Sequence, residues 1–307
     1  MRIVFMGTPD YAAITLQRLI DDKFEVLAVF AQPDKPVGRK QILTPPATKV
    51  VALENNIPVY QPNTLRDGEA YNTLKELNPD VIVVVAYGKI LPKEILDLPK
   101  YGCINGHASL LPKLRGASPI QWSIVTGEEK TGVTTMLMDE GMDTGDILET
   151  VEVAIGCDET AEELFDRLAP ISAELMVSTL KKAKDNMLAP IKQNESEATY
   201  APIIKKEMAH IDFNKTADEI CNAIRGFYSW PCAFCFINDK RIKVIKARKS
   251  NYKHNECGTV IKNDDKLVIS CKDGSVEFVT VQPEGAKAMP AQVMLNGHKI
   301  SIGTKVN

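Results

Sequence analysis

The residues best suited to chemistry in this chain are an asparagine and a histidine two positions apart, Asn105 and His107. They follow a strand-like stretch, Tyr101–Ile104, and alternate side chains of a strand point to the same face, so both are expected to face one cleft. A histidine takes or gives a proton near neutral pH, and an asparagine amide donates a hydrogen bond to an oxygen that gains negative charge. From residue types alone, a loop histidine satisfied by backbone groups is the commoner arrangement.

An acidic loop, Met138–Ile147, follows another predicted strand, Thr131–Met138. If both strands end at one edge of the sheet, a carboxylate of this loop lies beside His107, orients the imidazole and favours the imidazolium. A glycine-rich turn with solvated acids is the alternative. A calcium loop is not expected, because the D-x-D-x-D-G spacing with a distal glutamate is absent.

The elements around these residues alternate between strand and helix. Short apolar runs predict strands at Arg2–Met6, Phe24–Ala31 and Val81–Ala86, the last a β-branched run typical of a strand buried on both faces. Asp10 is expected to cap the first helix, and Ala161–Leu180 to form a long amphipathic helix. This alternation predicts an α/β fold with an open, mostly parallel, Rossmann-like sheet, whose ligands bind at the carboxyl ends of the strands.

The first turn, Gly7–Asp10, stands where a dinucleotide-binding fold carries G-x-G-x-x-G. The second and third glycines are missing, and Pro9 and Asp10 occupy positions where a pyrophosphate needs close approach to the backbone. A nicotinamide or flavin cofactor is therefore not expected, and Gly7 is interpreted as part of a tight turn.

A second domain is predicted at residues 204–307, a small OB-like β-barrel that follows a catalytic domain of residues 1–203. Residues 194–201 are interpreted as a polar linker, and Thr216 and Glu219 fit a capping box before one short helix. Hairpin signals separate short strand-like runs, and barrels of the OB type often bind nucleic acids. The runs are Ala233–Ile237, Arg241–Ala247, Thr259–Lys262, Leu267–Cys271, Val276–Val281 and Gln292–Leu295.

The composition, 44% hydrophobic and 25% charged, fits a soluble protein. The chain has no apolar run near the ~20 residues of a membrane helix and no signal-peptide layout, so a cytoplasmic protein is expected. Residues 205–307 carry 17 Lys and Arg against 11 Asp and Glu, whereas residues 1–204 carry 20 against 29. A basic part on an acidic body favours a polyanionic partner, although a solvated lysine-rich surface has the same signature.

Seven cysteines at irregular spacing predict reduced thiols. Cys232 and Cys235 form a C-x-x-C, but no second pair or nearby histidine cluster completes a zinc site. We therefore expect buried structural cysteines, and no bound metal.

Two segments together resemble the folate-dependent formyltransferases: N-G-H-A-S-L-L-P-K-L-R-G-A-S-P-I, which begins at Asn105, and D-E-G-M-D-T-G-D-I, which begins at Asp139. The resemblance implies 10-formyltetrahydrofolate as the donor, no metal, and Asn105, His107 and Asp143 as catalytic residues. The sequence departs from the family at Gly106, where a branched apolar residue is common, and a glycine is expected to loosen the strand end. The implied folate contacts are Tyr87, Lys89, Leu91, Ser109, Leu110, Leu111, Pro112, Asp139, Glu140 and Gly141.

Three features resemble the members of that family that formylate initiator methionyl-tRNA. These are the opening M-R-I-V-F-M-G-T-P-D-Y-A, the basic loop Gln32–Lys49, and the segment Tyr200–Pro202 followed by Arg225–Pro231. A basic loop suits a phosphate backbone, and the strand Lys240–Lys249 places its cations on one face, although the loop could also be a flexible surface excursion. The predicted tRNA contacts are Lys35, Arg39, Lys40, Lys49, Lys240, Arg241 and Lys243.

The reaction implied by this resemblance is formyl transfer to the α-amine of methionyl-tRNA, which gives formylmethionyl-tRNA for translation initiation. The nearest alternative is a formyltransferase that acts on a sugar-nucleotide amine, which has less need for the loop Gln32–Lys49 and the basic barrel. A non-catalytic RNA-binding protein with a relic core and a nicotinamide dehydrogenase are further alternatives. The sequence does not determine the oligomeric state, and a monomer is the expectation.

Overall fold

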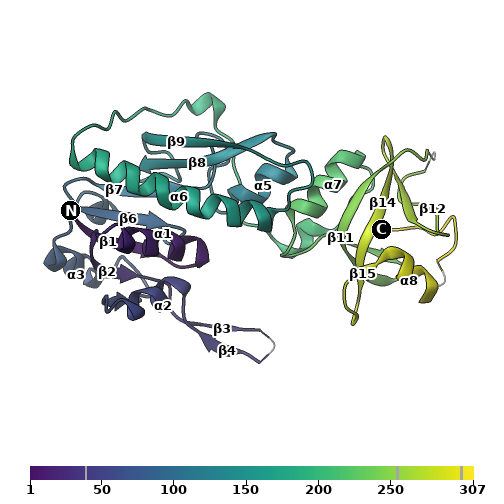
Figure 1. Ribbon diagram of the computed structural model, residues 1–307, viewed down its shortest axis with the longest axis horizontal. Helices are drawn as coiled ribbons and strands as arrows, with labels where there is room; N and C mark the ends of the chain where they lie inside the picture. Colours follow the sequence, from purple (N-terminus) through teal and green to yellow (C-terminus); the bar gives the residue numbers. More distant parts are fainter. Residues whose placement is uncertain (39, 254–255, 298–299) are drawn as a thin grey trace. The chain divides into compact units, whose positions relative to one another are not determined.

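The computed structural model describes residues 1–38, 40–253, 256–297 and 300–307, and the chain divides into two compact units (Figure 1). Unit 1 comprises Met1–Pro119, Thr131–Val153 and Phe165–Ala201, and unit 2 comprises Ile120–Lys130, Ala154–Leu164 and Pro202–Asn307. In the described part of the chain, no helix has the length and apolar character needed to cross a membrane.

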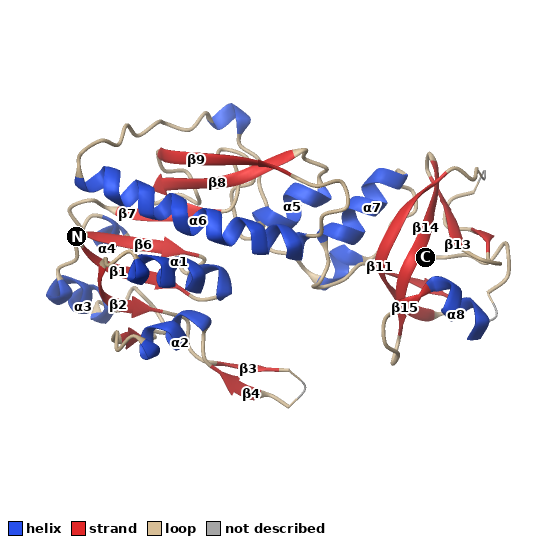
Figure 2. Cartoon of the chain, viewed as in Figure 1, coloured by secondary structure: helices blue, strands red, loops and turns tan. Residues whose placement is uncertain are grey.

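Unit 1 contains a seven-stranded sheet with the order β5-β2-β1-β6-β7-β8-β9 (Figure 2). The pairs β1–β2, β1–β6, β2–β5 and β6–β7 are parallel, whereas β7 and β8 are antiparallel. The predicted mostly parallel α/β sheet is therefore confirmed. The strands are β1 (Arg2–Gly7), β2 (Glu25–Phe30), β5 (Val59–Tyr60), β6 (Val81–Val85), β7 (Cys103–His107), β8 (Lys130–Leu137) and β9 (Ile147–Ala154).

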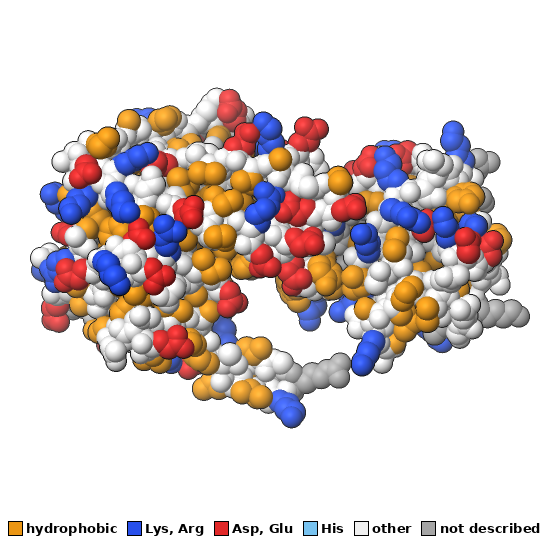
Figure 3. Space-filling model, viewed as in Figure 1, with side chains coloured by type: hydrophobic (Ala, Val, Ile, Leu, Met, Phe, Trp, Pro, Cys, Tyr) orange, Lys and Arg blue, Asp and Glu red, His pale blue; other side chains and the backbone are white. Residues whose placement is uncertain are grey.

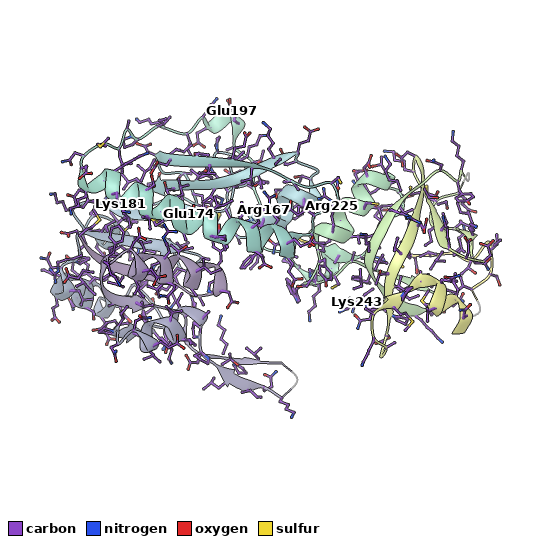
Figure 4. All side chains as sticks on the ribbon, in the orientation of Figure 1. Arg167, Glu174, Lys181, Glu197, Arg225 and Lys243 are labelled. Carbon is purple, nitrogen blue, oxygen red and sulfur yellow. The ribbon has the colours of Figure 1, made fainter. Side chains whose placement is uncertain are left out.

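The predicted long helix is confirmed as α6, and it continues to Lys184. Lys181 and Glu174 of α6 form ion pairs with Asp22 and Arg18 at the end of α1 (Figure 4). The predicted cap by Asp10 is wrong: Asp10 lies in the first turn of α1, where its charge complements the helix dipole without capping it. The helices up to residue 184 are α1 (Asp10–Asp21), α2 (Ala47–Glu54), α3 (Glu69–Leu77), α4 (Lys93–Leu96), α5 (Pro119–Val125) and α6 (Ala161–Lys184). Of these, α5 from Ile120 onward and α6 up to Leu164 belong to unit 2.

Gly106 lies in the middle of β7 and is buried. It pairs with Thr135 of β8, and a Cβ at this position would lie 3.3 Å from Ser172 Oγ and 3.4 Å from Met176 Cε, both in α6. α6 therefore occupies the space that a branched side chain would need, whereas the expected loosening of the strand end by glycine stays a prediction. Since alternate residues face opposite sides, Asn105 and His107 point away from α6.

Unit 2 contains an antiparallel sheet with the order β10-β11-β14-β13-β12, and β15 pairs with β14. Val306 bridges to Ile237 of the edge strand β10, and Lys305 bridges to Thr259, which precedes the other edge strand, β12. Residues 305–306 therefore pair backbone groups at both edges of the sheet that would otherwise lack a hydrogen-bond partner. The predicted antiparallel β domain is thus confirmed. The strands are β10 (Phe234–Ile237), β11 (Lys240–Ser250), β12 (Val260–Lys262), β13 (Leu267–Cys271), β14 (Gly274–Pro283) and β15 (Met289–Pro290).

The helices of unit 2 include one confirmed prediction and one error. The capping box of Thr216 and Glu219 is present at the start of α7 (Ala217–Gly226). The strand predicted at Gln292–Leu295 is wrong, because these residues belong to the helix α8 (Ala291–Gly297), which packs Ala291 and Met294 into the core. Cys232 and Cys235 are buried free thiols, as expected.

The close packing of α6 on Gly106 predicts that a branched residue destabilises unit 1. Gly106→Val forces at least Met176 or Ser172 to shift, and such overpacking costs about 1–3 kcal/mol. Thermal unfolding should show a midpoint lower by several degrees, and Met176→Ala in the same chain should recover part of the loss. Gly297→Val is the control, because a Cβ there meets no atom within 4 Å; equal midpoints for the two valine variants would contradict this account.

Candidate active site

His107 ends β7 with a buried side chain that has an oxygen beside each ring nitrogen. Nε2 lies 3.0 Å from the carbonyl oxygen of Leu114, and because a carbonyl only accepts, Nε2 must carry a hydrogen. Nδ1 lies 3.6 Å from Oδ2 of Asp143. A neutral imidazole has one N–H, whereas an imidazolium has two, so only the protonated ring directs a hydrogen at both oxygens.

Asp143 reaches His107 from the opposite edge of the sheet. Because β8 runs antiparallel to β7, Leu137 pairs with Ile104 and the loop after β8 starts near the amino end of β7. The prediction that both loops leave one sheet edge is therefore wrong. The structure nevertheless brings the two side chains together, and the backbone N–H of Gly116 donates to the same Oδ2 of Asp143 at 2.7 Å.

Asn105 lies on the same face of β7 as His107 and is half-buried. Its neighbours in the sheet are Val84 of β6 and Met136 of β8. The structure therefore places the amide and the imidazole of the predicted centre on one strand face, with the carboxylate beside the imidazole.

Three residues other than glycine adopt a left-handed backbone in the loops around this centre. Ala86 has a φ of 45°, Leu114 a φ of 58° and Asp143 a φ of 54°. Each such conformation costs on the order of 1–2 kcal/mol for a residue with a side chain. Strained backbone of this kind concentrates at functional sites, where the surrounding structure holds it in place.

Several predicted folate contacts are buried within the unit. The Ser109 hydroxyl donates to the carbonyl of Lys113 at 2.6 Å, and Leu111 is 7% exposed, while Leu110 and Pro112 are half-buried. These four residues support the loop that carries Leu114, whose carbonyl accepts from His107.

The predicted contacts after β6 are also largely internal. Tyr87 and Leu91 belong to a hydrophobic cluster of the sheet, and burial raises the pKa of Tyr87 to about 12. The Tyr87 hydroxyl has no hydrogen-bond partner among the residues that the structure describes. Lys89 Nζ donates to the carbonyls of Pro62 and Asn63.

The loop Asp139–Gly141 is exposed and borders a hollow of about 730 Å³. Its other walls include Lys93 and Leu96 of α4 and the residues Tyr101–Gly102 before β7. Among the described lining residues none is Asn105, His107 or Asp143, so three predicted folate contacts border this hollow while the catalytic candidates lie outside it. Lys93 forms an ion pair with Glu140 at 3.4 Å.

Two exposed apolar side chains lie in the segments Tyr87–Leu91 and 139–143, to which the family resemblance assigns folate contact. Ile90 is 69% exposed in the loop after β6, and Met142, next to Asp143, is 62% exposed. Val84 pairs with Asn105, so the loop after β6 starts beside the end of β7.

Sequence reasoning missed the backbone groups of Leu114 and Gly116 that hold His107 and Asp143. Both residues fall inside the run that carried the resemblance, as K-L-R-G. No residue type identifies a backbone carbonyl or N–H as functional, so only their position in that run signalled them.

The predicted basic loop Gln32–Lys49 contains a hairpin of β3 (Lys35–Val37) and β4 (Ile42–Thr44), followed by the start of α2. Lys35 and Lys40 are exposed, and Arg39 lies outside the described residues. Figure 3 shows apolar side chains on this hairpin, where Val37, Ile42 and Leu43 are more than half exposed. Lys49 instead stabilises the start of the hairpin, because its Nζ donates to the carboxylate of Asp34 at 2.9 Å and to Gln61 at 2.8 Å.

In unit 2, the predicted contacts Lys240, Arg241 and Lys243 belong to β11, and Figure 4 labels Lys243. Lys240 is exposed and Lys243 half-buried. The Arg241 guanidinium carbon lies 3.9 Å from the ring centroid of Phe234 in β10, a cation–π contact. In the part of the chain that the structure describes, no group of three or more His, Cys, Asp or Glu side chains is placed to hold a metal ion.

Residues 1–180 match the family model described as formyl transferase, and residues 203–299 match the model of the formyl transferase C-terminal domain. The chain belongs to the formyl transferase family. Its members are enzymes that transfer a formyl group, and the match includes Asn105, His107 and Asp143 as well as both loops that surround them.

The chain is similar over nearly its full length to proteins called methionyl-tRNA formyltransferase. It is 49% identical to that of Caldanaerobacter subterraneus over 99% of each chain, and 48% identical to that of Clostridioides difficile over 99% of each chain. The N-formyltransferase from Helicobacter canadensis, solved with folinic acid and dTDP-3-aminofucose, shares the fold, with a TM-score of 0.68, 24% identity and coverage of 92% of this chain and 98% of that one.

The geometry around Asp143 predicts that a side chain at Gly116 is costly. Gly116 has a φ of 118°, and a Cβ would lie 2.8 Å from the carbonyl oxygen of Ala201, so Gly116→Ala must move the N–H that holds Asp143. Gly68→Ala is a matched control, because Gly68 has a φ of 83° with no atom within 4 Å of its Cβ position.

Both alanine variants incur backbone strain, and Gly116→Ala should lose about 1–3 kcal/mol more in the free energy of unfolding. Chemical denaturation of the two purified variants measures the difference. Equal losses would show that the contact with Ala201 is not limiting.

Proposed function

We propose that this chain transfers the formyl group of 10-formyltetrahydrofolate to the α-amine of initiator methionyl-tRNA, and so produces formylmethionyl-tRNA. The observation that carries the choice of acceptor is the similarity over 99% of both chains to proteins called methionyl-tRNA formyltransferase. The site supports the chemistry, because it combines an amide, an imidazole and a carboxylate on one side of the sheet. A sugar-nucleotide amine remains the alternative acceptor.

The residues around the centre suit a folate donor. Ile90 and Met142 offer apolar surface to a flat heteroaromatic ring, and the exposed residues Asp139–Gly141 offer polar groups of the kind that a pterin requires. We place the donor against the loops after β6 and β8, with its formyl group at Asn105 and His107. In this proposal Ser109, Leu110, Leu111 and Pro112 shape the wall beside it.

Asn105 and His107 act on the formyl oxygen. As the methionine amine forms a bond to the formyl carbon, that oxygen gains negative charge, and donors fixed in advance stabilise the charge at no cost of reorganisation. The Asn105 amide donates to it, and the imidazolium of His107 donates once its Nε2–H exchanges the Leu114 carbonyl for the formyl oxygen.

Asp143 orients His107 through the contact at Nδ1. The carboxylate also accepts a proton from the attacking amine and passes it, directly or through water, to N10 of the folate. The bond between N10 and the formyl carbon then breaks, and N10 leaves with that proton. No step in this scheme requires a metal.

We propose that residues 1–203 form the catalytic domain and residues 204–307 a tRNA-binding domain, each with one predicted basic surface. On the hairpin, Lys35, Arg39 and Lys40 contact phosphates, and Lys49 supports the hairpin through Asp34. On β11, Lys240, Arg241 and Lys243 contact the tRNA backbone without reading its sequence. A cytoplasmic location and a monomeric state accompany this proposal.

The direct test is incubation of the purified chain with 10-formyltetrahydrofolate and charged initiator tRNA, followed by detection of formylmethionine. A parallel reaction with a UDP-amino sugar as acceptor separates the two candidate functions. Transfer to the tRNA but not the sugar supports the proposal. Transfer to the sugar alone would replace it with the alternative, and no transfer to either would leave a binding protein.

The mechanism predicts that His107→Ala and Asp143→Ala reduce the turnover number by about 10²-fold or more, because each removes a group that acts in the transition state. Single-turnover kinetics with methionyl-tRNA measure the effect, and circular dichroism confirms that the variants fold. Lys113→Ala, at an exposed position of the same loop, is the control. Turnover near the wild-type value in either active-site variant would remove that residue from the mechanism.

The proposed role of the hairpin predicts that Arg39→Ala with Lys40→Ala weakens tRNA binding. The loss of two phosphate contacts should reduce the slope of log K against log salt by about 2, while folate binding is unchanged. Filter binding across a salt series measures this slope.

The matched control for the hairpin removes two exposed lysines elsewhere in unit 1, Lys75→Ala with Lys184→Ala. This variant has the same change in net charge. A slope that changes equally in both variants would indicate a general charge effect rather than contacts made by the hairpin.

A further inference from the structure

The segment after α6 returns along unit 1 and is tied to Arg115, the largest fully buried side chain of the described chain. The Arg115 guanidinium donates to Gln193 Oε1 at 3.1 and 2.8 Å, and to the Glu195 carboxylate at 2.9 and 2.8 Å. A buried guanidinium must be paired, because an isolated buried charge is very costly. Gln193 and Glu195 supply that pairing.

The pairing with Arg115 fixes which way the Gln193 amide points. A guanidinium only donates, so Gln193 must present its oxygen to Arg115 and its NH₂ group to the other side. On that side, Nε2 donates to the carbonyl of Asp143 at 2.8 Å and to the carbonyl of Gly145 at 2.7 Å. The carbonyls of Asp143 and Gly145 only accept. A flipped Gln193 amide would therefore place its oxygen against these two carbonyl oxygens and its NH₂ group against the N–H groups of Arg115.

The same short segment therefore holds Asp143 at two points. The backbone N–H of Gly116 fixes the Asp143 carboxylate, while Arg115, through Gln193, fixes the Asp143 carbonyl. These hydrogen bonds maintain the left-handed backbone of Asp143, at a φ of 54°, and thereby the position of its carboxylate beside His107. Misplacement of a reacting group by about 1 Å costs on the order of 100-fold in rate.

We propose that Gln193, oriented by Arg115, is a positioning residue that holds Asp143 against His107 for formyl transfer; this role rests on the function proposed for the site. Gln193 touches neither the imidazole nor the carboxylate in the described contacts, so it acts through the Asp143 backbone. Gln193 lies 50 residues after Asp143 in the sequence, directly before residues 194–201, which the sequence analysis interpreted as a polar linker.

The test uses Gln193→Glu in the full-length chain. A glutamate keeps an oxygen for Arg115 but replaces the NH₂ donor with an oxygen that faces the carbonyls of Asp143 and Gly145. The expected result is a kcat lower by about 10- to 100-fold with an unchanged KM for methionyl-tRNA. Glu197→Gln is the control, because this exposed glutamate belongs to the same segment and contacts Asn194 rather than Arg115 or Asp143, and its kcat should stay within about twofold of wild type.

A double-mutant cycle with Asp143→Asn separates positioning from general structural damage. If Gln193 acts through the Asp143 carboxylate, Gln193→Glu should change the single-turnover rate by less than about twofold in the Asp143→Asn background. Multiplying effects in the double variant, or a normal kcat for Gln193→Glu, would overturn the proposal. If Gln193→Glu does not fold, Gln193→Met, which removes the donor without adding a charge, takes its place in the cycle.

The outcome is distinguishable from failure of the proposed function. If the wild-type chain formylates a UDP-amino sugar instead of methionyl-tRNA, the same cycle with the sugar acceptor tests Gln193 unchanged. If the wild-type chain transfers a formyl group to neither acceptor, the proposed function fails and the positioning role fails with it.

Discussion

The contact between His107 and Asp143 is the interaction on which the site depends. The 3.6 Å separation of Nδ1 and Oδ2 is meaningful only because each partner is fixed by a second group. The Leu114 carbonyl accepts from Nε2 of His107, and the Gly116 N–H donates to the carboxylate of Asp143. Both groups belong to the loop after β7, so one loop sets the relative position of the acid and the imidazole.

The fold around this loop also helps to fix the position of His107 relative to Asp143. Gly106 allows α6 to pack closely on one face of β7, and Asn105 and His107 consequently occupy the other face. Left-handed backbone at Leu114 and Asp143 aims their carbonyl and carboxylate groups at His107. The local strain of these two residues is balanced by burial and hydrogen bonds elsewhere in unit 1, as is usual where geometry matters more than local stability.

Sequence reasoning predicted the sheet, and the shared strand face of Asn105 and His107, because both have a local signature, whereas Asp143 was assigned only through the family resemblance. The β-branched run Val81–Val85 and the spacing of Asn105 and His107 are recognisable within a few consecutive residues. Contacts between distant segments have no comparable local pattern in the sequence. The antiparallel pairing of β8 and the return of the Asp143 loop depend on contacts between distant segments. The wrong strand prediction at Gln292–Leu295 has a local cause, because Gln, Met and Leu are strong helix formers.

The most direct test of the central arrangement is a crystal structure of the chain bound to a non-transferring analogue of the formyl donor. The formyl oxygen is expected to lie about 2.7–3.1 Å from both the Asn105 amide nitrogen and a ring nitrogen of His107, with Asp143 at the other ring nitrogen. A donor bound with its formyl group beyond hydrogen-bond reach of both side chains would contradict the account.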